Sequence, residues 1–77
     1  MKSYAATFFS HYDAIIFFGS LKERGIKAKL MPAPRKISAS CGTSVSFETD
    51  VLIDFSAYEL DAVYEENLRG FEIIYRA

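Results

Sequence analysis

The order of apolar and polar residues in the first half of the chain predicts a strand, a helix and a second strand. Tyr4 to Phe9 is apolar on both faces, which is typical of a central strand. Ser10, with Asp13 three positions later, predicts the N-cap of a helix that runs to about Arg24 and stops at Gly25.

Two further strands and one ambiguous stretch follow in the pattern. Ile26 to Met31 alternates apolar with basic residues, which predicts a half-buried strand ended by Pro32. Thr43 to Phe47 alternates again, with small hydroxyl residues on the second face, and predicts the third strand. Val51 to Phe55 either continues as a strand after a turn or crosses the edge of the core.

The last third of the chain predicts a second helix and a final strand. Ser56 to Glu59 matches a capping box, and apolar residues follow at roughly helical spacing to Leu68, before Gly70. Phe71 to Tyr75 then reads as a strand. The order is βαββαβ, which predicts one α+β domain over residues 1–77, a ferredoxin-like sandwich with two helices on one face of a four-stranded antiparallel sheet. Because the helices cover only one face, the open face is expected to be polar or to form a homodimer.

Composition narrows the classes of function. One cysteine and one histidine, His11, exclude an internal disulfide and a four-ligand zinc site, so no structural metal and no cofactor is expected. Nine Lys and Arg balance ten Asp and Glu, so nucleic acid is not an expected partner. No apolar run is long enough to cross a bilayer, and no secretory signal is recognised, so we expect no membrane partner and a cytoplasmic location.

Cys41 is the best candidate for chemistry in this chain. It stands in a hydroxyl-rich stretch with Gly42 and Ser40, whereas a buried structural cysteine more often lies inside an apolar run. In the predicted topology the helix N-terminus, Ser10 to Asp13, opens at the same sheet edge as the loop from Pro32 to Gly42, joined there by the turn from Asn67 to Gly70. A helix N-terminus favours a thiolate, and Gly42 leaves the sulfur unshielded.

Several neighbouring residues have a plain interpretation beside a functional one. Arg35, Lys36 and Arg69 are either solvated charges or cations that act on the sulfur or on an anion. The hydroxyl residues Ser38, Ser40 and Thr43 satisfy loop backbone groups or hydrogen-bond a thiolate. His11 is a capping or surface residue, or a base that pairs with the thiol.

The stretch from Leu30 to Gly42, with its P-x-P-R segment followed by S-x-S-C-G, resembles the small-domain family DUF3343, whose members are described as selenium or sulfur carrier-like proteins. The resemblance implies that Cys41 carries a sulfur or selenium atom as a persulfide or selenopersulfide between donor and acceptor proteins. It extends to the motif residues Pro32, Pro34, Arg35, Ser38, Ser40, Cys41 and Gly42.

Two hypotheses of function remain. The first is a carrier protein that uses the Cys41 thiol, rather than a turnover enzyme, since the chain shows no phosphate loop or serine nucleophile motif. The alternative is a non-catalytic, dimeric regulatory module that binds a small ligand or a protein.

Overall fold

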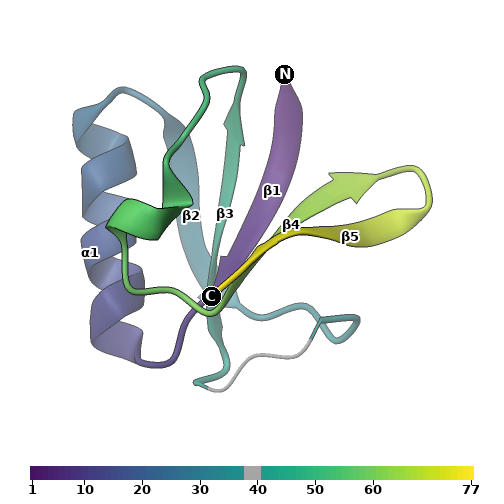
Figure 1. Cartoon of the computed structure of the whole chain (residues 1–77), viewed down its shortest axis with the longest axis horizontal. Coiled ribbons are helices and arrows are strands. Elements are labelled where there is room, and N and C mark those ends of the chain that lie inside the picture. Colours follow the sequence, from purple (N-terminus) through teal and green to yellow (C-terminus); the bar gives the residue numbers. More distant parts are fainter. Residues whose placement is uncertain (38–40) are drawn as a thin grey trace.

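The protein consists of one long helix and a five-stranded sheet (Figure 1). The computed structural model describes residues 1–37 and 41–77. The elements in chain order are β1 (Lys2–Thr7), α1 (His11–Glu23), β2 (Lys27–Pro32), β3 (Thr43–Thr49), the short 3-10 helix η1 (Phe55–Ala57), β4 (Ala62–Asn67) and β5 (Gly70–Arg76).

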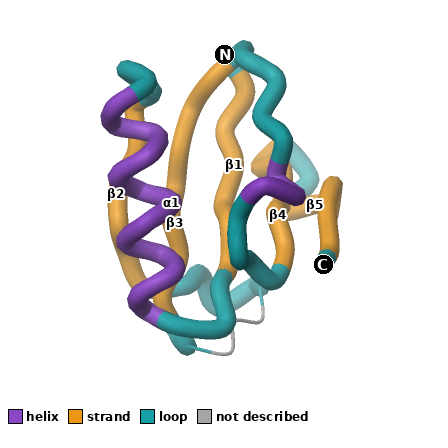
Figure 2. The backbone as a smooth tube through the Cα atoms, turned by 60° about the vertical axis from the view of Figure 1, so that its left-hand side comes forward, coloured by secondary structure: helices purple, strands orange, loops and turns teal. Residues whose placement is uncertain are grey.

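All neighbouring strands of the sheet are antiparallel, in the order β2-β3-β1-β4-β5. Since β1 and β2 both pair with β3, they run in the same direction, and α1 returns the chain between them. Figure 2 shows α1 lying across β2 and β3 on one face of the sheet. No helix in residues 1–37 or 41–77 is long and apolar enough to cross a membrane.

The capping signals in the sequence correctly predict where α1 begins and ends. The Ser10 side chain accepts a hydrogen bond from the Asp13 amide at 3.2 Å, which satisfies one of the free amides of the first turn. Gly25, with φ at +74°, follows the C-cap residue Arg24 in the left-handed conformation that glycine adopts without strain.

Aromatic residues of the helix and the sheet fill the main core. The Phe17 side chain is fully buried, and its ring lies 5.5 Å from that of Phe8, 5.6 Å from that of Phe47 and 4.9 Å from that of Tyr58, measured between centroids. Such tilted and edge-to-face pairs add to the free energy that burial supplies. The predicted face of β3 is confirmed, because Val45 and Phe47 both belong to this core.

The predicted second helix from Ser56 to Leu68 is wrong. The segment forms only η1, whose N-cap is Asp54, and then enters β4, a strand that pairs with both β1 and β5. Val63 and Tyr64 are β-branched and aromatic residues that favour strands, and they bury their side chains on opposite faces of the sheet. The tertiary pairing therefore overrides an apolar spacing that is also compatible with a helix.

A tight hairpin replaces the expected helix end. β4 and β5 are joined by Leu68 and Arg69 alone, and the Asn67 side chain accepts a hydrogen bond from the Arg69 amide at 2.9 Å. Gly70, with φ at +114°, begins β5 in a conformation that other residues rarely adopt.

These observations correct the predicted fold class. The protein is not a two-helix, four-stranded ferredoxin-like sandwich but a five-stranded antiparallel sheet with one helix on one face. The strand reading of Val51 to Phe55 is also wrong, because this segment pairs with no strand among the described residues. It crosses the edge of the core instead, where Ile53 and Phe55 pack against the main cluster.

Candidate functional site around Cys41

Cys41 lies at the end of the sheet where β1 ends and α1 begins. Pro32, the last residue of β2, pairs with Thr43, the first residue of β3. The Ala33 amide donates a hydrogen bond to the Gly42 carbonyl at 2.9 Å, which extends this pairing by one step. The loop that carries Cys41 thus leaves and rejoins the sheet at one place, near the first turn of α1 (Figures 1 and 2).

This loop contacts both faces of the sheet. Ile37 is 7% exposed and packs with Ala5, Ala62 and Tyr64 on the face opposite α1. Cys41 is half-buried and packs against the main core on the helix side. Ile37 therefore anchors the chain on the face opposite α1, four residues before Cys41 contacts the core on the helix side. This anchor restricts the positions that the sulfur can reach.

The Cys41 thiol has one hydrogen-bond partner in the described part of the chain. Its Sγ donates to the Thr43 carbonyl oxygen at 3.7 Å, a distance typical of a weak sulfur donor. Gly42 between them has φ at +73°, and this left-handed conformation turns the loop into β3. Cys41 as a residue is neither fully buried nor fully exposed.

The first turn of α1 lies against the start of β3, as the sequence predicts. His11 Nδ1 is 3.1 Å from Thr43 Oγ1, although the two residues are 32 positions apart in the chain. The amino end of a helix carries partial positive charge, which stabilises a nearby anion such as a thiolate. The Asp13 carboxylate, which would oppose this effect, accepts a hydrogen bond from the Ser10 hydroxyl at 2.8 Å.

Arg35 and Lys36 form the tip of a turn in the same loop. The Ile37 amide donates to the Pro34 carbonyl at 3.1 Å, which closes a four-residue turn, and the two cations between them are exposed. Neither makes an ion pair or a side-chain hydrogen bond with another described residue. Among the described residues, no hydrogen bond joins either side chain to Cys41, although they are close to it in the sequence.

The predicted contribution of Arg69 is wrong. Because β4 runs antiparallel to β1, its last residues pair with the beginning of β1, as Glu66 does with Ser3. The turn from Asn67 to Gly70 therefore lies at the end of the sheet away from Cys41, and Arg69 with it.

Two residues that the structure places in the site carried little weight in the sequence. The sequence offers Thr43 only as one of three hydroxyl residues that satisfy loop backbone groups or hydrogen-bond a thiolate. In the structure its backbone carbonyl accepts the hydrogen bond of the thiol, and its hydroxyl contacts His11. Ile37 anchors the loop, and it is the one large apolar residue between Pro32 and Cys41. Ser38 and Ser40 lie outside the described residues.

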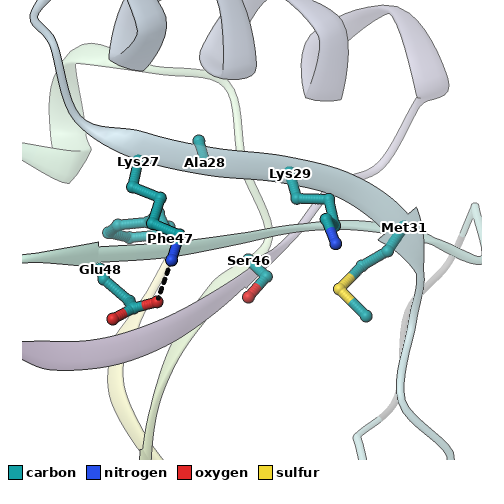
Figure 3. A pocket seen from close by; sticks show the side chains of 7 residues that line it. All are labelled: Lys27, Ala28, Lys29, Met31, Ser46, Phe47 and Glu48. Carbon is teal, nitrogen blue, oxygen red and sulfur yellow. Dashed lines mark ion pairs between the residues drawn. The ribbon is translucent and has the colours of Figure 1, made fainter.

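A separate hollow of about 320 Å³ lies beside β2 and β3. Lys27, Lys29 and Met31 extend from β2 away from α1, and Ser46 forms part of the floor (Figure 3). Lys27 pairs with Glu48 at 3.6 Å, whereas Lys29 has no ion-pair partner among the described residues. Cys41 does not line this hollow. The described residues also contain no cluster of three or more His, Cys, Asp or Glu suited to a metal ion.

Comparison with known families matches residues 3–66 to the family described as "Putative Se/S carrier protein-like". The match covers β1, α1, β2, the Cys41 loop, β3 and nearly all of β4. The chain belongs to this family, as its resemblance to DUF3343 predicts. Comparisons with curated proteins and with solved structures returned no match.

Proposed function

We propose that the protein carries a single sulfur or selenium atom on Cys41. The observation that carries this proposal is a half-buried cysteine in a chain of the Se/S carrier-like family, hydrogen-bonded to Thr43, which itself contacts the first turn of a capped helix. A carrier has to be loaded and unloaded by other molecules, so its sulfur must be reachable from outside. The half-buried position of Cys41 meets that requirement and also shields one side of the adduct.

The loading step is an exchange of sulfur between two cysteines. The Cys41 thiolate attacks the outer sulfur of a donor persulfide, R–S–SH, forming a new bond from Sγ to that sulfur. The S–S bond of the donor breaks, and its own sulfur leaves as a thiolate that takes up the proton lost by Cys41. No external oxidant or reductant is consumed, because the sulfane sulfur moves at an unchanged oxidation level. Selenium moves in the same way from R–S–SeH.

Delivery reverses this chemistry at an acceptor. An acceptor thiolate attacks the outer atom of the Cys41 adduct, and Cys41 leaves as a thiolate. Donor and acceptor are proteins in this proposal, and each must bring a reactive sulfur to the sheet edge that bears Cys41.

Sulfur loading can be tested directly by mass. The purified protein is incubated with a cysteine desulfurase and cysteine, and its intact mass is measured before and after treatment with a reducing thiol. We expect the mass to increase by one sulfur atom, the increase to disappear on reduction, and Cys41→Ser to show none. If the wild-type protein gains no sulfur while a small thiol in the same mixture does, the carrier function is refuted.

A second candidate function is a module that binds a small anion in the hollow beside β2. Lys29 and the hydroxyl of Ser46 line this hollow, and the Lys29 ammonium is not engaged by another charge in the described residues. Inorganic phosphate and citrate serve as probes in thermal unfolding. A rise in Tm that Lys29→Met abolishes and Cys41→Ser preserves supports this function, and no rise at millimolar probe contradicts it.

A further inference from the structure

His11 is linked to Cys41 through a single residue, Thr43. The imidazole Nδ1 lies 3.1 Å from the Thr43 hydroxyl, and the carbonyl of the same Thr43 accepts the hydrogen bond of the Cys41 thiol at 3.7 Å. His11 is the first residue of α1, so this contact connects the amino end of the helix to the strand that follows the cysteine.

We propose that His11 is a positioning residue for Cys41. By holding Thr43, it keeps the positive end of α1 and the thiol at a constant separation. This inference rests on Cys41 being the reactive group of the proposed carrier, and it adds the residue that fixes the position of its sulfur. The contact does not require one protonation state of His11. A neutral imidazole accepts from the Thr43 hydroxyl at Nδ1 or donates to it, according to the tautomer, and an imidazolium donates.

The surroundings of His11 indicate that its imidazole acts through the contact with Thr43 and is not needed to stabilise α1. His11 is exposed, and α1 already has Ser10 as its N-cap, so the helix does not need the imidazole to begin. Elsewhere the helix is held by the buried side chains of Ala14, Phe17 and Leu21. The imidazole contact is therefore an added tether at the one end of α1 that faces the Cys41 loop.

The test is the rate of alkylation of Cys41 by iodoacetamide in the folded protein, together with the rate of sulfur loading. His11→Ala removes the contact, and we expect both rates to fall about three- to tenfold, the range that one hydrogen bond of ordinary strength controls. His11→Asn should restore most of the rate, because its amide can donate to or accept from the Thr43 hydroxyl. Rescue by Asn separates positioning from general-base catalysis, which Asn cannot perform.

Variants of Thr43 test the same contact from its other partner. Thr43→Val keeps the shape and strand propensity but loses the hydroxyl, so it should reproduce the effect of His11→Ala, while Thr43→Ser should not. The double variant His11→Ala with Thr43→Val should react no more slowly than either single variant. Tyr12→Ala, at an exposed neighbouring position with no hydrogen bond to β3, should leave the rates unchanged.

Unchanged rates in both single variants, or losses that multiply in the double variant, would overturn the proposal. Alkylation does not depend on sulfur carriage. If the wild-type protein takes up no sulfur, the carrier function fails, and the alkylation series still decides whether His11 positions Cys41.

Discussion

Gly42 is a residue whose backbone conformation matters more than the space around it. Its φ of +73° is one that residues with a side chain rarely adopt, yet a Cβ placed there would meet, beyond its two chain neighbours, no atom of the described residues within 4 Å. The need for glycine is therefore conformational rather than steric. The sequence suggests glycine as an unshielded approach to the sulfur, and the structure adds the turn that directs Cys41 toward Thr43.

Gly42→Ala should lower the free energy of unfolding by about 1 kcal/mol, because alanine is strained at this positive φ. Gly19→Ala is the matched control. It lies within α1, and beyond its chain neighbours and the nearby helix backbone no atom of the described residues lies within 4 Å of the added Cβ. The substitution should instead stabilise the protein by about 0.5–1 kcal/mol. Urea denaturation measures both. A stability gain in Gly42→Ala would contradict the conformational role.

At the scale of elements, the segment between β3 and β4 contacts α1 although it does not form the start of the predicted second helix. Tyr58 follows η1 and covers the outer side of Phe17, with ring centroids 4.9 Å apart and the planes nearly perpendicular. Its hydroxyl lies 2.6 Å from the Ser20 hydroxyl on α1. One aromatic side chain thus joins an irregular segment to α1, in a part of the chain where the sequence predicts a second helix.

Tyr58→Phe should reduce the free energy of unfolding by about 1 kcal/mol, since it removes this hydrogen bond and keeps the ring contact with Phe17. Ser20→Ala should have a similar effect, and the double variant should cost less than the sum of the two. Thermal or urea unfolding measures the cycle. Strictly additive losses would show that the two hydroxyls do not interact.

Elements with local signals were predicted well from the sequence, whereas those decided by pairing were not. Ser10, Asp13 and Gly25 mark the ends of α1 through their own hydrogen bonds and dihedral angles, which need no distant residue. Residues 56–68 carry an apolar spacing that suits a helix as well as a strand. The pairing of Ala62–Asn67 with β1 on one side and β5 on the other decided between them, and such partners are not visible locally.

At the scale of the whole molecule, the two faces of the sheet are covered differently. α1 and the segment after β3 cover one face, while the other holds a smaller cluster of Ala5, Ile37, Ala62 and Tyr64, with Phe71 packed against it. The homodimer predicted through this second face stays a prediction. Ile73, which pairs with Tyr64 and is 44% exposed, is an apolar side chain that such a dimer would bury.

Sedimentation at high micromolar concentration tests the dimer. We expect the wild-type protein to associate and Ile73→Glu to weaken association, because a carboxylate buried in an interface is costly. Ile15→Glu is the control: it is 45% exposed on α1, on the other side of the molecule, and should have no effect. A wild-type protein that sediments only as a monomer would refute the dimer.

The sequence by itself determined the first helix, the strands around the Cys41 loop, the family and Cys41 as the candidate reactive residue, because caps, glycines and a contiguous motif are local features. Only the tertiary structure decided that the final third forms a hairpin and that Arg69 lies away from the cysteine. It also decided that His11 contacts Thr43, and that Ile37 anchors the Cys41 loop on the face opposite α1. Those outcomes depend on strand order and register, which arise from contacts between residues distant in the chain.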